Sequence, residues 1–213
     1  MQHRVVKIRN LSPSAYVLRL ERNGFDFQPG QCVNLGLKGS GINREYSTYS
    51  GIEDPYLEFL IKEVPGGTVS PALRKLEEGS EVELHGPYGS FVIAPEKIEN
   101  FPFILIGTGT GIAPFHSFVR SFPSLDYQLI LGIRHVSERY DFRDYDASRV
   151  TCCISREPGD GFHGRVTDYL KESRISPTSL YYLCGNQRMI YDVYDLLRQN
   201  GVSGDHIRTE AFF

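Results

Sequence analysis

The 213-residue sequence has few of the features that mark membrane, secreted or nucleic-acid-binding proteins. No stretch approaches the ~18 consecutive apolar residues of a membrane-spanning helix, and the first residues contain no apolar signal region. The net charge is −3, and no block of lysine and arginine marks a surface for nucleic acid or lipid. We therefore expect a cytoplasmic chain that binds neither membrane nor nucleic acid.

Cysteine is also scarce, with four residues at Cys32, Cys152, Cys153 and Cys184. Their spacing matches no zinc or iron–sulfur pattern, and the six histidines form neither an H-E-x-x-H motif nor a clustered pair. Few, unpatterned cysteines are typical of a reducing compartment. We expect no metal site.

The sequence does contain two halves with different hydrophobic periods. Up to residue 98, short alternating segments are separated by Gly- and Pro-rich turns, and only residues 70–76 have a helical pattern, with Ser70 as the expected cap. From residue 99, apolar runs alternate with helical patterns at 114–121, 166–173 and 188–200. These patterns predict a two-domain β + α/β fold: an antiparallel Greek-key β-barrel over 1–98, then a doubly wound parallel sheet over 99–213.

The first half contains two segments suited to a flavin nucleotide. In Arg44-Glu45-Tyr46-Ser47 the aromatic ring can stack on a planar heterocycle, the hydroxyl can bind its polar edge, and the cation can pair with phosphate. In Gly66-Gly67-Thr68-Val69-Ser70 a diglycine turn opens a helix whose free N–H groups can face an anion. Either segment alone is better explained as an ordinary strand or hairpin turn, because such short segments are common.

The second half begins with a glycine-rich turn, Gly107-Thr108-Gly109-Thr110-Gly111, between a buried strand and a helix. This context suits a dinucleotide pyrophosphate, although the spacing is G-x-G-x-G and not the G-x-G-x-x-G of standard dehydrogenases. A purely structural turn is the alternative. Cys184-Gly185 follows the last strong strand, at the carboxyl end where open α/β sheets bind ligands, although a cysteine there is commonly only a small buried hydrophobe.

Together these segments resemble the ferredoxin–NADP(+) reductase family over essentially the whole chain. The resemblance is carried, in order, by Phe27 to Gln31, Arg44 to Ser47, Gly67 to Ser70, Gly86 to Phe91, Gly107 to Pro114 and Cys184-Gly185. The ending Glu210-Ala211-Phe212-Phe213 resembles the bacterial branch. The resemblance implies bound FAD, with FMN left open, and NADP(H) as the substrate.

The resemblance also implies site residues. Those expected around FAD are Arg44, Tyr46, Ser47, Gly66, Gly67, Thr68, Val69, Ser70 and Phe212, the last covering the flavin face where a tyrosine is more usual. Those expected around the pyridine nucleotide are Gly107, Thr108, Gly109, Thr110, Gly111, Cys184 and Gly185, with Arg134, Ser155, Arg156 and Arg165 at a 2′-phosphate. The residues expected nearest the reacting atoms are Ser47, Cys184 and Glu210.

The implied activity is hydride transfer between NADP(H) and FAD, and single-electron transfer between FAD and a separate ferredoxin or flavodoxin. NADH use stays open, because the arginines are also compatible with an ordinary surface. We expect a monomer. The alternatives are an NAD(P)H-dependent reductase of free flavin or of an oxygenase component, and a non-catalytic flavin or nucleotide sensor on the same scaffold.

Overall fold

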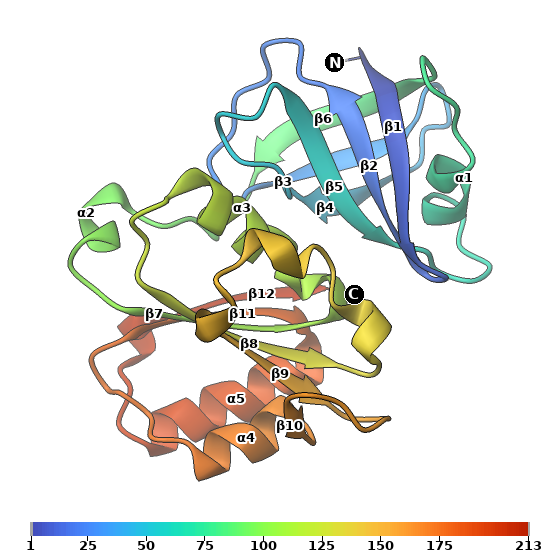
Figure 1. Cartoon of the computed structure of the whole chain (residues 1–213). Coiled ribbons are helices and arrows are strands. Elements are labelled where there is room, and N and C mark those ends of the chain that lie inside the picture. The colour runs from blue at the N-terminus through green and yellow to red at the C-terminus, as the bar shows by residue number, and fades with distance from the viewer. Residues whose placement is uncertain (1, 213) are drawn as a thin grey trace. The chain divides into compact units, whose positions relative to one another are not determined.

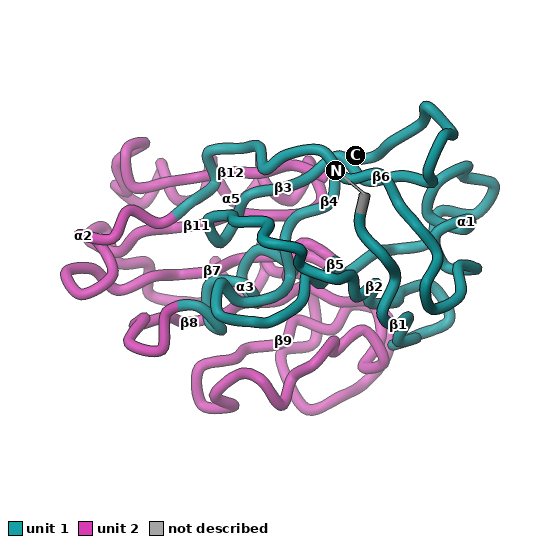
Figure 2. The backbone as a smooth tube through the Cα atoms, turned by 90° about the horizontal axis from the view of Figure 1, so that it is seen from above, with its two compact units in different colours: residues 1–92, 113–121 teal, residues 93–112, 122–213 magenta. Residues whose placement is uncertain are grey.

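The computed structural model describes residues 2–212, which fold into two compact units (Figures 1 and 2). Unit 1 contains Met1–Val92 and Ala113–Ser121, and unit 2 contains Ile93–Ile112 and Phe122–Phe213. The helix at 113–121 therefore belongs by its contacts to unit 1, although it lies within the second half of the sequence.

Unit 1 is a six-stranded antiparallel sheet with the order β4-β3-β6-β1-β2-β5. Its elements are β1 (Gln2–Ser12), β2 (Ala15–Glu21), β3 (Cys32–Leu37), β4 (Asn43–Ser47), β5 (Tyr56–Lys62), α1 (Ser70–Arg74), β6 (Glu81–Tyr88) and α3 (Ala113–Ser121). The backbone N–H of Tyr49, just after β4, donates to Glu58 O on β5 at 2.8 Å. The two ends of the sheet thus meet, as the predicted barrel requires.

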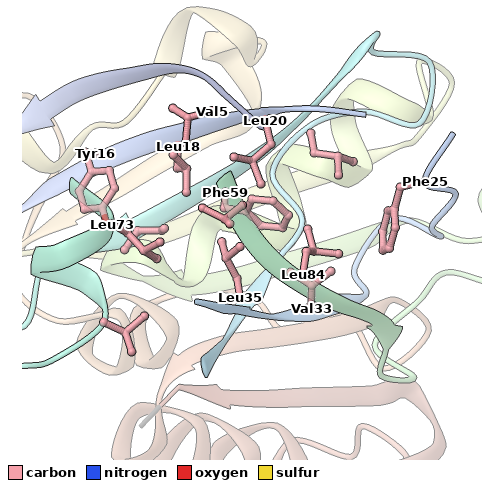
Figure 3. Close-up of a cluster of buried hydrophobic side chains, with 14 of the residues drawn as sticks. Val5, Tyr16, Leu18, Leu20, Phe25, Val33, Leu35, Phe59, Leu73 and Leu84 are labelled. Atoms are coloured by element: carbon pink, nitrogen blue, oxygen red, sulfur yellow. The ribbon is translucent and has the colours of Figure 1, made fainter. Parts of the chain in front are cut away.

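The core of unit 1 comes from the alternate, inward-facing residues of these strands. Leu18, Leu35 and Phe59 are fully buried there, and Leu73 of α1 packs against them (Figure 3). Burying such a side chain is worth about 1.5–3 kcal/mol. The same core supports Tyr46, which is only partly buried and packs on its edge.

Helix α1 differs in one detail from the expectation. The helix begins at Ser70 itself, and Val69 holds the cap position without a side-chain hydrogen bond. The Ser70 hydroxyl instead accepts a hydrogen bond from Val64 N at 3.0 Å. The prediction that Ser70 caps the helix is therefore wrong, because its side chain closes the preceding loop.

Unit 2 is a six-stranded sheet with the order β10-β9-β8-β7-β11-β12, and every pair is parallel. Its elements are α2 (Pro95–Ile98), β7 (Phe103–Thr108), η1 (Gly109–Ile112), β8 (Tyr127–Ile133), η2 (Val136–Glu138), η3 (Phe142–Asp144), η4 (Ala147–Arg149), β9 (Val150–Ile154), β10 (Phe162–His163), α4 (Val166–Glu172), β11 (Leu180–Asn186), α5 (Gln187–Gln199), η5 (Gly204–His206) and β12 (Ile207–Phe212). Helices α4 and α5 lie together on one face of this sheet (Figure 1).

The predicted fold class is thus confirmed: an antiparallel β unit is joined to a parallel α/β unit. Strand β12 had no counterpart among the predicted segments. None of the helices within residues 2–212 combines the length and apolarity needed to cross a bilayer.

Candidate functional site

The order of the strands in unit 2 indicates where a ligand would bind. From β7, the chain builds outward through β8, β9 and β10, and then returns to the other side of β7 to form β11 and β12. In open α/β sheets, ligands bind beyond the carboxyl ends of the strands where the order reverses. Here that point lies between β7, which ends at Thr108, and β11, which ends at Asn186.

Three of the predicted residues form a row across this point. Register pairs Cys184 with Gly107 on one side and with Glu210 on the other. The Cys184 side chain is fully buried, and burial raises the pKa of its thiol well above the ordinary value, with a further contribution from the Glu210 carboxylate. The thiol is therefore a small neutral group. Phe212, two residues further along β12, is paired in register with Asn186.

The carboxyl ends of β7 and β11 are locked together by glycine. A Cβ on Gly111 would lie 2.4 Å from Cys184 O, and a Cβ on Gly185 would lie 2.6 Å from Thr108 Oγ1. The same Thr108 oxygen accepts a hydrogen bond from Asn186 N at 2.9 Å. Gly111, Gly185 and Thr108 thus have a packing role that holds the two strand ends in contact. Sequence reasoning missed this role of the Thr108 hydroxyl, because its partner lies 78 residues away.

Gly109 is different, because it faces open space. Its φ of +54° lies in the left-handed region, and nothing lies within 4 Å of the position of a Cβ. Gly109 begins η1, and Thr110 follows it, partly exposed. A chain segment that needs glycine for its conformation and leaves the space above it empty can bring backbone N–H groups close to a phosphate.

The predicted 2′-phosphate residues gather along the same edge of the sheet. Arg134 follows β8, Ser155 and Arg156 follow β9, and Arg165 follows β10. The backbone continues the ladder between them, because Arg156 N donates to Arg134 O at 3.1 Å. The Ser155 hydroxyl donates to Ile133 O at 3.2 Å, which leaves its oxygen able to accept.

These arginines are exposed and have no anionic partner. Within residues 2–212, the guanidinium groups of Arg134, Arg156 and Arg165 form no hydrogen bond or ion pair. Elsewhere in unit 2, Arg139 binds Asp160 at 2.8 Å and Arg149 binds Asp126 at 3.1 Å. Within residues 2–212, Arg143 and Arg174 of unit 2 likewise form no ion pair, but Arg134, Arg156 and Arg165 follow the strands at the sheet edge that also contains Gly109, where they supply positive charge for a phosphate.

In unit 1, the strand β4 presents Arg44 and Tyr46 on one face. Residues two apart on a strand point the same way, about 6.6 Å apart, and Ser47 is the last residue of the strand. Arg44 is exposed, Tyr46 is half-buried and Ser47 is buried. Burial raises the pKa of Tyr46 to about 12 although the Arg44 cation opposes it, so the phenol stays neutral. An aromatic plane beside an exposed cation is the arrangement predicted for a flavin nucleotide.

The glycine turn before α1 is closed by a backbone hydrogen bond and leaves open space at Gly66. Gly67 N donates to Val64 O at 2.9 Å, and Gly66 has a φ of +73° with nothing within 4 Å of a Cβ. Thr68 is exposed, whereas Val69 and Ser70 are buried. The five-residue helix α1 is too short for a strong dipole, so the backbone N–H groups of the turn are its main anion-binding feature.

Tyr16, which the sequence did not single out, connects the two flavin segments. Its hydroxyl donates to Ser70 O at 2.7 Å, and its ring is fully buried. Burial raises the pKa of its phenol, and Tyr46 packs against the core cluster that contains Tyr16. A single buried tyrosine thus holds the Gly66–Ser70 turn beside the strand that carries Tyr46.

Arg74 fixes the other end of α1. Its guanidinium donates to Glu63 Oε2 at 2.8 Å, to Asn10 Oδ1 at 2.9 Å and to Pro13 O at 2.8 Å. It also lies over the Tyr16 ring, 5.5 Å from the centroid. Both ends of α1 are therefore held by side chains of unit 1.

Comparison with known proteins gives two domain matches. Residues 2–93 match the oxidoreductase FAD-binding domain, and residues 105–195 match the oxidoreductase NAD-binding domain. Within residues 2–212, no group of three or more His, Cys, Asp or Glu side chains has the arrangement of a metal site.

Several relatives are similar over nearly the whole chain. The electron transfer component of toluate 1,2-dioxygenase from Pseudomonas putida is 30% identical over 99% of this chain and 67% of its own length. The reductase component of propane 2-monooxygenase from Rhodococcus jostii is 31% identical over 98% of this chain and 62% of its own. A flavodoxin/ferredoxin–NADP reductase from Escherichia coli is 26% identical over 89% of this chain and 86% of its own length. The chain thus spans about two thirds of the oxygenase relatives it matches.

Solved structures give the same grouping. A cytochrome P450 reductase from Amycolatopsis has a TM-score of 0.89 and 28% identity, over all of this chain and 70% of its own. A ferredoxin–NADP(+) reductase from Neisseria gonorrhoeae, solved with bound FAD and NADP, has a TM-score of 0.89 and 23% identity, over all of this chain and 98% of its own. The latter likeness, at that identity, concerns the fold.

Proposed function

The chain belongs to the ferredoxin–NADP(+) reductase family of FAD- and NAD(P)-binding oxidoreductases, and from this premise we propose that it is an FAD-dependent NADP(H) reductase. The proposed reaction is hydride transfer between NADP(H) and bound FAD, and single-electron transfer between FAD and a separate ferredoxin or flavodoxin. One observation carries most of the weight: the open left-handed Gly109 lies on the same sheet edge as the Gly107–Cys184–Glu210 row and three unpaired arginines.

The residues of unit 1 fit a bound FAD by their chemistry. Tyr46 offers a neutral aromatic plane, and Arg44 offers an exposed cation. The Gly66–Ser70 turn offers backbone N–H groups with open space at Gly66. FAD, when bound, supplies the redox chemistry by accepting a hydride and releasing electrons singly. Ser47 is the proposed donor to the ring edge. We assign the flavin to residues 1–98 and the pyridine nucleotide to 99–213.

The residues of unit 2 orient the nucleotide. Gly107, Thr108, Gly109 and Thr110 are proposed to hold the pyrophosphate, because Gly109 keeps the space above the turn open. Cys184 presents a neutral thiol, so it adds no charge beside a nicotinamide, and Glu210 lies next to it. Their proposed role is positioning and exclusion of water, and no proton transfer from either is required.

The three unpaired arginines favour NADPH over NADH. A phosphate that reaches Arg134, Arg156 or Arg165 meets a guanidinium that no protein carboxylate occupies in residues 2–212. Because the groups are exposed, each contact is screened, and we expect selectivity of roughly tenfold to a hundredfold from the set.

The decisive test is anaerobic addition of NADPH to the purified protein. We expect a yellow protein whose flavin absorbance bleaches within seconds. A yellow protein that stays oxidised would exclude the reductase and leave the flavin sensor. A colourless protein that reduces added free flavin would instead support the free-flavin reductase.

A second candidate acceptor is an oxygenase component, because two of the relatives over the whole chain are named as electron-transfer or reductase components of oxygenases. Titration of reduced protein with a ferredoxin, a flavodoxin and an oxygenase component separates the candidates by rate. We further propose a cytoplasmic monomer, in keeping with four buried free thiols. Size-exclusion chromatography with light scattering tests the oligomeric state.

A further inference from the structure

Helix α3 has a position that its place in the sequence does not predict. It follows directly on η1, the glycine turn of unit 2, but its contacts place it in unit 1 (Figure 2). Its Phe115 and Phe118 pack with Phe91, with centroid distances of 6.2 and 6.1 Å. On an ideal helix, residues 116, 117, 120 and 121 lie on the opposite face.

That opposite face is bonded to residues 49–54, the segment that follows the flavin strand β4. His116 Nδ1 donates to Tyr49 O at 2.6 Å, and Ser117 Oγ donates to Ser50 O at 2.7 Å. The His116 and Tyr49 rings are stacked 3.8 Å apart at 13°, and the two side chains are 2% and 0% exposed. Two buried side chains of α3 thus hold the backbone two and three residues after Ser47.

The remaining contacts of α3 lie further along the segment. Arg120 binds Asp54 with both Nε and Nη2, at 3.0 and 2.7 Å, and Ile52 N donates to Ser121 Oγ at 3.0 Å. These groups are closer to the surface and lie five to seven positions beyond Ser47. They hold α3 against residues further from the flavin strand.

The backbone between Ser47 and Ser50 is also held by Gln31 and by Glu58 of β5. Thr48 N and Oγ1 both donate to Gln31 O, at 2.9 and 3.0 Å. Tyr49 N donates to Glu58 O, and Glu58 N donates to Ser50 Oγ at 3.0 Å. His116 supplies the third side of this support, and it does so from a helix that continues from the glycine turn.

We propose that His116, assisted by Ser117, is a positioning residue for the flavin strand, and that α3 thereby couples the glycine turn to Tyr46 and Ser47. This inference rests on the proposed function and identifies a residue that positions its flavin site. The ring stack orients His116, and the bond from Nδ1 fixes the Tyr49 carbonyl. Displacement of reacting groups by about 1 Å can cost a hundredfold in rate, so loss of this bond should slow flavin reduction.

Two substitutions separate the bond from the stack. His116→Phe keeps an aromatic ring against Tyr49 but removes the donor, whereas His116→Asn keeps a donor near the Nδ1 position but removes the ring. Arg120→Gln is the control, because it weakens the bidentate pair with Asp54 at the far end of the segment. Each FAD-loaded variant is compared with wild type for Tm, flavin spectrum, and the rate of anaerobic reduction by NADPH.

We expect His116→Phe to slow flavin reduction about tenfold or more and to shift the flavin absorbance, with His116→Asn restoring most of the rate. Arg120→Gln should lower Tm and leave the rate and spectrum unchanged. If His116→Phe lowers Tm as Arg120→Gln does but reduces flavin at the wild-type rate, the histidine is only structural and the inference is refuted. If His116→Phe does not fold, Ser117→Ala takes its place, because it removes only the bond to Ser50 O. A Ser117→Ala protein that reduces flavin at the wild-type rate would refute the inference, and a slower one would support it. Wild type that NADPH does not bleach would refute the proposed function instead.

Discussion

Replacement of Gly111 by alanine should disrupt the nucleotide site by forcing apart two strand ends. A Cβ at this position would lie 2.4 Å from Cys184 O, 2.7 Å from Cys184 C and 2.8 Å from Gly185 Cα. All three atoms belong to the backbone of β11, so no side chain can rotate away. Gly111 does not have a left-handed φ, and the substitution therefore adds only a steric conflict.

The cost follows from the size of that conflict. Contacts at this range require a shift of several tenths of an ångström, and overpacking of this kind costs about 1–3 kcal/mol. For a chain of this length each kcal/mol lowers Tm by about 2–4 °C, so a cost near 2 kcal/mol lowers Tm by about 4–8 °C. The same shift moves Thr108 and Cys184 relative to each other, and we expect KM for NADPH to rise at least severalfold.

Gly204→Ala is the matched control for this experiment. Gly204 also lies in a short 3-10 helix of unit 2 without a left-handed φ, but its nearest atom to a Cβ is Tyr194 Oη at the ordinary distance of 3.5 Å. Its Tm should stay the same or rise slightly, because alanine restricts the unfolded chain. Differential scanning calorimetry and steady-state kinetics on both variants give the comparison. Equal Tm values for Gly111→Ala and wild type would show that the strand ends are not packed as described.

Three further results are expected. Tyr16→Phe removes the donor to Ser70 O and should lower the free energy of unfolding by about 1–2 kcal/mol and the FAD content after purification, as denaturant titration and absorbance will show; unchanged FAD retention would contradict its role in holding the turn. Arg156→Ala should reduce the NADPH/NADH ratio of kcat/KM roughly twofold to tenfold. Arg149→Ala removes a guanidinium that is already paired with Asp126, so it should leave the ratio unchanged. Equal ratios in the two variants would exclude Arg156 from the site. Burial raises the pKa of Cys153 from 9.0 to about 12. The stability that the neutral thiol contributes is therefore complete below pH 9 and is lost as pH rises from 9 to 12, at about 1.4 kcal/mol per pH unit. Cys153→Ala should flatten the fall of Tm between pH 9 and 10, and an unchanged slope would refute the raised pKa.

The periodicity of the sequence was sufficient to predict the fold class and the main helices. The helix expected at 188–200 is α5, Gln187–Gln199, because its apolar residues recur at helical spacing and Gly201 ends it. Strand β12 was missed because only Ile207 of its six residues is buried. An edge strand of this kind has no apolar run, and it is defined by its ladder with β11, which no local pattern reports.

Apart from what the family resemblance implied, the candidate site was predictable only where its residues are close in sequence. Arg44 and Tyr46 share a strand, so their common face follows from alternation alone. The bond from Tyr16 to Ser70 spans 54 residues, and nothing in the residues around Tyr16 distinguishes it from any buried tyrosine. Non-local hydrogen bonds of this kind decide how a turn is held, and they arise only when the strands have been brought into register.

The three glycines of the turn after β7 show why a motif can indicate a site and still conceal how it works. Gly107 stands in register with Cys184, Gly111 allows the backbone of β11 to approach, and Gly109 alone combines a left-handed φ with open space. Gly111 is therefore required by the fold whether or not a nucleotide binds. An alanine at Gly109 would meet no protein atom within 4 Å, so its effect on NADPH binding, beyond the backbone strain of a left-handed alanine, would come from the ligand. Strand packing thus explains the last glycine of the G-x-G-x-G spacing, and phosphate access is the role proposed for its central glycine at this edge of the sheet.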